Sequence, residues 1–515
     1  MAMTTANVKN LKGYRRHIVS DVLADRYPYL ENIRGHLKPD EVSTAAGTRL
    51  FPRLVEQLKN PTMPPERLTE ALITICDLIS HQERKCDAIA SDVVAAATNL
   101  LLHSSVPVRR EAARVIAGVA LLLGARSLMP LGNAGLSRTE IGNNGSGPTL
   151  PRLVKLLLSC DDELVKQHTA EAFAAITIFR DGCEQMVEQG AVKGTARYLC
   201  ATLPELPATR PLGICLMMLL KTLAAVAMYA KVGMRDILGV GLIAKVVTLL
   251  GRIPLETGIP VITLPESIEM VRHAMRLLWF CGNHAEGRRE TLKADAVSVI
   301  TWYLRHSDAK VREAAVCALN VVSLETAGKK EVLKHSLDPL SQLLHSEEET
   351  TYLHETCVQL VRCAAELPAF RFAFTRHNLQ SIWLLEKVFS TTALAALAPL
   401  LEPAEDIVLR NQAAIVMAHF LLAEKPGKGD DIRVPPVSPP DLIDSPRRYA
   451  LEECVALLPN LLRLLEVNED GALKCFDALM DEPRVRKELQ AHLDERREPV
   501  PTEASRKTIE ALLKK

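Results

Sequence analysis

The stretch VRREAARVIAGV, residues 108–119, begins with charged residues, contains a pair of alanines and ends in apolar residues. KVREAAVCALNVV, residues 310–322, repeats this order later in the chain. In both stretches a small residue lies four positions after an apolar start, and a large apolar residue lies four positions after that. Spacings of four place all three residues on one face of an α-helix. The chain therefore uses the same kind of helix twice and is expected to bury one face of it each time.

Further copies of this pattern occur along the chain. We call the residue at the centre of each triplet the anchor. The triplets are Val108, Ala112, Ile116; Val165, Thr169, Phe173; Met270, Ala274, Leu278; Val311, Ala315, Leu319; Leu353, Cys357, Val361; Leu409, Ala413, Met417; and Ala71 with Ile75, which lacks the apolar start. An apolar element precedes each of several copies, and its last apolar residue lies a nearly constant distance before the anchor. That distance is 11 residues from Leu101 to Ala112 and 13 from Leu344 to Cys357.

The anchors recur with a regular period. Ala71 and Ala112 are 41 residues apart, Ala274 and Ala315 are 41 apart, and Ala315 and Cys357 are 42 apart. Helical repeats of ~40–47 residues are typical of armadillo and HEAT proteins. The stretch 277–304 resembles the armadillo order of helix end, short helix and long helix, and EQGAVKGTARYL at 188–199 resembles that family's turn glycine before its second helix. The sequence therefore predicts an all-α, armadillo/HEAT-like right-handed α-solenoid.

The same register predicts the organisation of the chain. Residues 48–424 are expected to form the armadillo-like repeats, with inserted loops at 132–149 and 253–266. Segments outside the repeats are an N-terminal helical cap or extension at 1–47, a Pro-rich linker or insertion at 425–449, a final helical repeat or cap at 450–485, and a polar tail at 486–515. The linker assignment rests on the six prolines of residues 425–446.

Composition excludes several classes of function. The 515-residue chain is 48% hydrophobic and 24% charged, which is ordinary for a soluble globular protein. Lys+Arg and Asp+Glu both number 62, so the formal net charge is zero. Proteins that bind nucleic acid or acidic membranes usually carry a basic excess, and we expect neither partner. The 12 cysteines include no CxxC pair, which argues against a zinc ribbon and fits a reduced intracellular protein.

One apolar segment resembles a membrane span. LGICLMMLLKTLAAVAMYA, residues 212–230, contains a single charge, Lys221, at its middle, and its flanks lack anchoring residues. We expect a helix buried between neighbouring helices. The N-terminal residues contain no apolar core of a secretory signal.

The sequence contains no recognisable catalytic or cofactor motif. GxxxxGK[ST], GxSxG, HExxH and calcium-loop patterns are all absent. Among the 14 histidines, His273 and His284 come closest to a site, and we expect both on the surface. No catalytic residue, metal ligand or cofactor-binding residue is therefore predicted. A chain whose repeats carry an enzymatic or enzyme-regulating activity remains the alternative of another class.

Stacked repeats leave an extended concave groove lined by the anchor-bearing helices. Residues two and six positions after each apolar start are expected to point into it. They are Arg110, Arg114, Gln167, Glu171, Arg272, Arg276, Glu313, Cys317, Glu355 and Gln359. The two arginine pairs could clamp acidic side chains, because a guanidinium matches a carboxylate in a two-bonded geometry. The alternative is that all these residues are solvated on exposed helix faces.

Residues 49–120 contain the most distinctive text: an L-x-x-L start, then A-L-x-x-I-C-D-L-I, then a repeat that begins V-R. The match is carried by Ala71, Leu72, Ile75, Cys76, Asp77 and Leu78. This stretch resembles the N-terminal half of the radial spoke head 14 family, armadillo proteins of motile cilia and flagella. The inserted loops and the residues beyond about 425 have no counterpart in it.

That resemblance implies a non-catalytic scaffold of the axoneme, in the cytoplasm and cytoskeleton of a cilium or flagellum. Its partners would be other proteins, namely radial spoke or axonemal subunits of a large complex. The alternative is a cytosolic armadillo adaptor that binds an extended peptide or a disordered partner in its concave groove.

Overall fold

The computed structural model describes residues 50–80, 82–121, 149–203, 205–253, 260–345, 351–367, 399–401, 407–421, 458–466, 470–480, 482–493 and 503–514. The regular secondary structure of these residues is helical, without a strand. The chain divides into two compact units, Met1–Cys281 and Gly282–Lys515. This boundary falls inside the range 48–424 that the sequence treats as one run of repeats. The predicted segments 1–47 and 425–449 lie outside the described residues.

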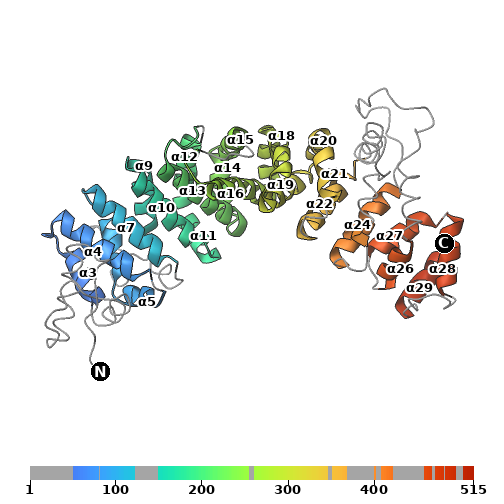
Figure 1. The fold of residues 1–515 in the computed structure, drawn as a ribbon, viewed down its shortest axis with the longest axis horizontal. Helices are drawn as coiled ribbons and strands as arrows, with labels where there is room; N and C mark the ends of the chain where they lie inside the picture. Colours follow the sequence, from blue (N-terminus) through green and yellow to red (C-terminus); the bar gives the residue numbers. More distant parts are fainter. Residues whose placement is uncertain are drawn as a thin grey trace. The chain divides into compact units, whose positions relative to one another are not determined.

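Unit 1 is a stack of helical repeats, and in each repeat one or two short helices precede a longer helix (Figure 1). Its anchor-bearing helices, which we call the third helices, are α4 (Pro65–Leu78), α7 (Val106–Val119), α10 (Glu163–Ile176), α13 (Arg210–Tyr229) and α16 (Leu264–Gly282). The helices that precede them are α3 (Phe51–Lys59), α5 (Gln82–Ala90), α6 (Val93–Leu100), α9 (Thr149–Ser159), α11 (Arg180–Glu188), α12 (Ala191–Thr202), α14 (Gly233–Gly239) and α15 (Leu242–Arg252). Third helices pack on their neighbours, α4 on α7, α7 on α10 and α10 on α13.

Unit 2 repeats the arrangement. Its helices are α17 (Ala285–Lys293), α18 (Ala296–Trp302) with the 3-10 turn η2 (Tyr303–Arg305), α19 (Ala309–Val322), α20 (Thr326–His335), α21 (Leu337–His345), α22 (Thr351–Ala364), the 3-10 turn η4 (Pro399–Leu401), α24 (Ile407–Leu421), α26 (Leu458–Glu466), α27 (Asp470–Leu479), α28 (Pro483–Leu493) and α29 (Glu503–Leu513). Here α19 packs on α22, α22 on α24, and α24 on α27.

The anchors explain why the third helices stack. Each one has no exposed surface: Ala71, Ala112, Thr169, Ala274, Ala315, Cys357 and Ala413. In the quoted stretch Val108 and Ile116 are also fully buried, so the whole triplet lies in the core. A small side chain at the crossing point lets two helices approach closely, and the large residues on either side fill the remaining space. The prediction of an all-α armadillo-like solenoid is confirmed.

A left-handed turn separates the first and second helices of four repeats. The residues with positive φ are Asp92, Gly190, Gly241 and Asp295, at 66°, 67°, 71° and 53°, and each directly precedes the second helix. Glycine adopts this conformation without steric cost, and aspartate tolerates it better than most residues. The turn glycine expected within 188–199 is therefore Gly190.

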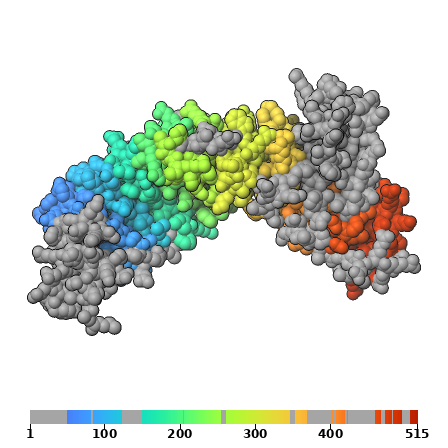
Figure 2. All heavy atoms as spheres, viewed as in Figure 1, coloured from blue at the N-terminus to red at the C-terminus, as the bar shows by residue number. Residues whose placement is uncertain are grey.

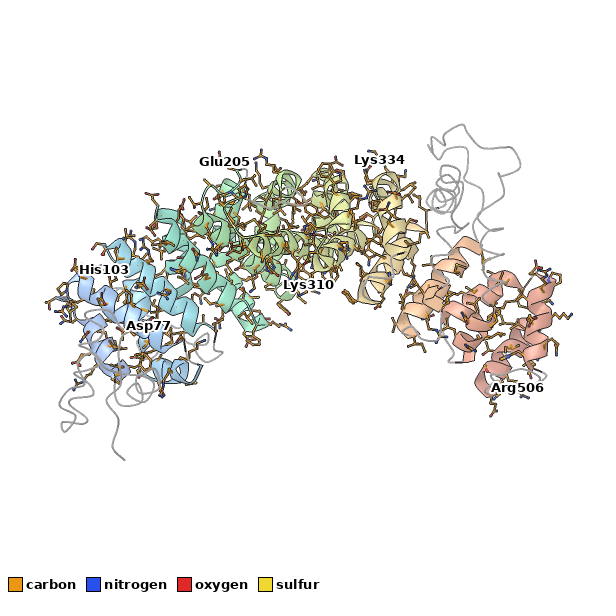
Figure 3. All side chains as sticks on the ribbon, viewed as in Figure 1. Asp77, His103, Glu205, Lys310, Lys334 and Arg506 are labelled. Carbon is orange, nitrogen blue, oxygen red and sulfur yellow. The ribbon has the colours of Figure 1, made fainter. Side chains whose placement is uncertain are left out.

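An arginine bridges each quoted helix to the turn before it. Arg109 Nη1 donates to the carbonyl oxygens of His103 and Ser104, at 2.7 and 2.8 Å. Arg312 makes the same two bonds to the carbonyls of residues 306–307, at 2.6 and 2.8 Å. Carbonyls that follow a helix lack intrahelical partners, so a guanidinium there satisfies two of them at once. The shared letters H-S and V-R encode this contact, and His103 is labelled in Figure 3.

Helix α13 is a copy of the repeat that the sequence pattern missed. Thr209 caps it by accepting a hydrogen bond from the backbone N–H of Leu212, as Asp162 caps α10 three residues before Val165. This register makes Leu216 the anchor, which is buried but large. By length and hydropathy α13 could cross a membrane, yet 61% of its most apolar window is buried inside the protein. Because it packs on α10, α11, α12 and α14, it is a core helix of unit 1.

Two segment boundaries differ from the sequence expectation. Helix α16 begins at Leu264, inside the predicted loop 253–266, because Thr263 and Glu266 cap it reciprocally through bonds of 3.3 and 2.7 Å. At the other end of the chain, α28 crosses the predicted boundary at residue 485. It buries Val485 and Leu489, and it packs on α29.

Candidate functional site

Unit 1 contains a cavity of about 440 Å³ that five of its helices line together. Its lining residues are Cys76, Ile79, Ser80, Lys85, Arg114, Ala117, Gly118, Leu121, Glu171, Ala174, Ala175, Ile178, Met218 and Lys221. They come from α4, α5, α7, α10 and α13 and the ends of these helices, and the four third helices follow one another along unit 1 in Figure 1. We call this cavity the groove.

The lining residues repeat with the helices. On α7 they lie two, five, six and nine residues after the anchor, and the same four positions of α10 line the groove. On α13 the positions two and five after the anchor supply Met218 and Lys221, and on α4 the positions five and nine supply Cys76 and Ser80. On α4, α7, α10 and α13, one face therefore lies in the core with the anchor, and the adjacent face lines the groove.

Small residues form the middle of the groove, and larger apolar residues form its edge. Positions five and six of α7 are Ala117 and Gly118, and those of α10 are Ala174 and Ala175. At position nine, Leu121 and Ile178 are 48% and 43% exposed. Apolar side chains left this accessible beside a hollow are typical of binding surfaces rather than of a closed core.

The groove lining also contains charged side chains. Lys85, Arg114 and Lys221 are cations, and Glu171 is the one anion among the lining residues. Lys85 lies along the groove with only 7% of its surface exposed. Within the described residues, neither Lys85 nor Lys221 has an ion-pair partner within 4.0 Å, whereas Arg114 Nη1 lies 3.3 Å from Glu111 Oε2.

The carboxylate of Glu171 is already bonded by its own helix. Gln167 Nε2 donates to Glu171 Oε1 at 2.8 Å, and His168 Nδ1 lies 2.7 Å from Glu171 Oε2. Burial would raise the pKa of the Glu171 carboxyl, but the bonds from His168 and Gln167 outweigh it and lower the pKa below its ordinary value. Glu171 thus stays charged while its oxygens are occupied.

Of the four groove residues predicted on α7 and α10, two line the cavity and two do not. Arg114 and Glu171 line the groove. Arg110 does not: its Nη2 donates to Asp162 Oδ2 at 2.8 Å and so joins α7 to the cap of α10. Gln167 is bonded to Glu171 rather than placed at the cavity. The predicted clamp of Arg110 with Arg114 is therefore not assembled as a pair.

The second predicted arginine pair lies on α16. Arg272 Nη1 donates to Glu269 at 2.5 Å, and both residues are on the same helix. The Arg276 guanidinium lies over the ring of Phe280, 5.5 Å from its centroid, and Phe280 stacks on Trp279 at 4.8 Å. Each of the two arginines therefore already has a partner on α16: Arg272 is ion-paired and Arg276 is stacked on an aromatic ring.

In unit 2 two of the predicted residues, Glu355 and Gln359, bond to each other. Gln359 Nε2 donates to Glu355 Oε1 at 3.2 Å, and Asn320 Nδ2 donates to Gln359 Oε1 at 3.4 Å. Glu313 is half-buried. Cys317 is almost fully buried, and burial raises the pKa of its thiol to about 12. Asn320, Gln359 and Glu355 therefore form a hydrogen-bonded network across α19 and α22.

Sequence reasoning missed most of the groove lining. Lys85 lies on α5, a first helix to which the register assigned no groove positions. Lys221 is the single charged residue of an otherwise apolar segment, and this was the sequence feature that could have indicated a groove position. Once α13 is recognised as a third helix, Lys221 falls at position five after the anchor.

The described residues contain no group of three or more His, Cys, Asp and Glu side chains able to hold a metal ion. The expectation that His273 lies on the surface is wrong, because it is only 6% exposed. Its Nε2 lies 3.4 Å from Glu269 Oε2. Burial and the nearby Arg272, Lys221 and Arg276 nevertheless lower its pKa to about 3.

Comparison with proteins of known structure supports the fold. An engineered protein aligns with 90% of this chain and 98% of its own, with a TM-score of 0.64 and 17% identity. A designed armadillo repeat protein and another in complex with the peptide (KR)4 each align with 53% of this chain and 99% of their own, at TM-scores of 0.42 and 0.41 and identities of 19% and 20%. No family model and no curated protein matches the chain.

The fold and the repeated helix register define the class of protein. It is an all-α, armadillo-like repeat solenoid.

Proposed function

We propose that the protein is a non-catalytic scaffold that binds an extended peptide segment of another protein in the groove of unit 1. The observation that carries this proposal is the register of the lining. Equivalent positions on α7 and α10, with matching positions on α4 and α13, form one cavity. A ligand that crosses successive repeats meets a similar helix face each time, as an extended chain does.

The groove also has the composition of a binding site. It combines small apolar residues, an accessible apolar edge and a few polar groups, and such combinations bury a ligand while fixing its orientation. Non-catalytic binding is the use that this lining supports.

Selection of peptides tests the proposal directly. A phage library of random twelve-residue peptides is selected on the full-length chain, and enriched peptides are titrated by fluorescence anisotropy. Ala117→Trp places an indole in the cavity and should weaken binding at least about tenfold, a loss of 1.4 kcal/mol or more. Ala244→Trp, at an exposed alanine of α15 outside the groove, is the matched control and should leave affinity unchanged. Absence of any enriched peptide, or equal binding by Ala117→Trp, contradicts the proposal.

A second proposal concerns the cellular setting. We propose, on the resemblance to the radial spoke head 14 family, that the bound partners are radial spoke or axonemal subunits in the cytoskeleton of a cilium or flagellum. Of the matched residues, Ala71, Leu72 and Ile75 have no exposed surface. A match on such positions follows the fold, so the setting needs its own test. A tagged copy in a flagellated cell should label the flagellum and co-fractionate with salt-washed axonemes, and a signal confined to the cytoplasm contradicts the setting.

A further inference from the structure

The groove has a charge preference as well as a shape. Its lining contains three cations, Lys85, Arg114 and Lys221, and one anion, a formal excess of two positive charges. The anion is Glu171, whose two oxygens are held by Gln167 and His168. Both oxygens of this anion are therefore already bonded by side chains of α10, while the lysines have no ion pair within the described residues.

Arg114 also presents its charge to the groove. Its side chain is 46% exposed, whereas that of its partner Glu111 is 12% exposed. Burial alone would lower the pKa of Arg114, but nearby Cys76 and Glu111 raise it on balance. The guanidinium thus stays protonated, with its outer part accessible. Arginine in such a position bonds a carboxylate in a charge-assisted geometry.

Further exposed apolar side chains lie at the ends of two groove helices. Ile178 lines the groove, the neighbouring Phe179 is 51% exposed, and Met228 and Tyr229 at the end of α13 are 46% and 41% exposed. These residues lie at the ends of α10 and α13, which pack side by side. Figure 2 shows the atoms of unit 1 packed into one continuous surface.

We propose that the groove of unit 1 binds an acidic linear peptide that carries apolar side chains between its carboxylates. Carboxylates of the peptide pair with Arg114, Lys221 and Lys85, and its apolar side chains pack on the alanines and on Leu121 and Ile178. This inference rests on the proposed function and specifies the chemistry of its ligand.

The composition of the selected peptides tests the inference separately from the function. Peptides enriched on the full-length chain should be rich in Asp and Glu together with Leu, Ile or Met, relative to the unselected library. Enrichment of basic or uncharged peptides overturns the charge preference while leaving groove binding intact. Failure to enrich any peptide overturns both the inference and the proposed function.

Charge reversal then tests the named cations. The double variant Arg114→Glu with Lys221→Glu should bind the acidic peptides at least about tenfold more weakly. The control Lys155→Glu with Lys193→Glu makes the same change in net charge at exposed lysines of α9 and α12 outside the groove, and its affinity should stay within about twofold of the parent, about 0.4 kcal/mol. Equal losses in both double variants overturn the assignment. Circular dichroism melting, together with the neutral variant Arg114→Gln with Lys221→Gln, separates a binding loss from misfolding.

Discussion

The close contact between α11 and the end of α10 makes Gly182 a sensitive position. A Cβ built there lies 1.8 Å from the carbonyl oxygen of Ile176 and 2.7 Å from its carbonyl carbon. Both are backbone atoms, and an ordinary carbon–oxygen contact is about 3.3 Å, so Gly182→Ala forces the helices roughly 1.5 Å apart. Overpacking of this kind lowers stability by about 3 kcal/mol. Alanine raises stability by about 1 kcal/mol relative to glycine, because it is the better helix former. We therefore expect a net loss of about 2 kcal/mol in the local free energy of opening.

Hydrogen exchange measures that loss within a repeat chain, whose repeats need not unfold together. Two kcal/mol corresponds to roughly thirtyfold faster exchange of the slow amides of α10 and α11. Gly239→Ala, at the end of α14, is the matched control, because a Cβ there meets nothing within 4 Å and should be neutral or slightly stabilising. Protection of α11 in Gly182→Ala within about twofold of the parent, about 0.4 kcal/mol, would refute the close approach.

Two further substitutions probe the core and the buried His273. Ala112→Leu overpacks a fully buried anchor and should lower the unfolding free energy by about 1–3 kcal/mol. Ala117→Leu, in the groove, should change the unfolding free energy by about 0.5 kcal/mol or less. Denaturant titration measures both variants, and equal effects contradict the anchor role. His273 has a pKa of about 3 when folded and an ordinary value of 6.5, so the unfolded chain binds more protons between these values and stability should rise with pH across this window. His273→Leu should flatten that rise when denaturant midpoints at pH 4.5 and 7.5 are compared, and an unchanged difference between them argues against burial of the imidazole.

The period and the anchors could be predicted from sequence because each repeat buries the same face. A fully buried Ala112 or Cys357 is the direct consequence of helices that cross closely, so small residues recur at that position. Helix α13 escaped the pattern because its anchor is Leu216, a large residue. The signal that identifies α13 is its cap: Thr209 lies three residues before the start of the register, as Asp162 does in α10.

The groove positions were predictable only in part. The sequence register shows which face of a single helix a residue lies on, whereas its bonding partner depends on how that helix packs against its neighbour. Position two after the anchor was predicted to face the groove; Arg114 and Glu171 at this position line the cavity, whereas Cys317 at the same position is buried. The position four residues earlier lies near the N-terminal end of the helix, where the cap of the next repeat comes within reach. Arg110 therefore binds Asp162, a contact that joins residues 52 apart in the sequence and that no local pattern encodes.

The same register produces two different surfaces in the two units, and this difference favours unit 1 as the binding site. In unit 2, Gln359 lies at position two after the anchor and bonds to Asn320 of α19, while Arg362 at position five donates to Gln412 of α24 at 2.7 Å. Those polar groups satisfy one another across neighbouring helices, so a ligand would have to displace bonds already made. In unit 1 the equivalent position five is Ala117, Ala174 or Lys221, and no such cross-helix bond forms among these described residues. The alanines leave space, and Lys221 has no ion pair with the residues that the structure describes, so a ligand at position five displaces no described cross-helix bond.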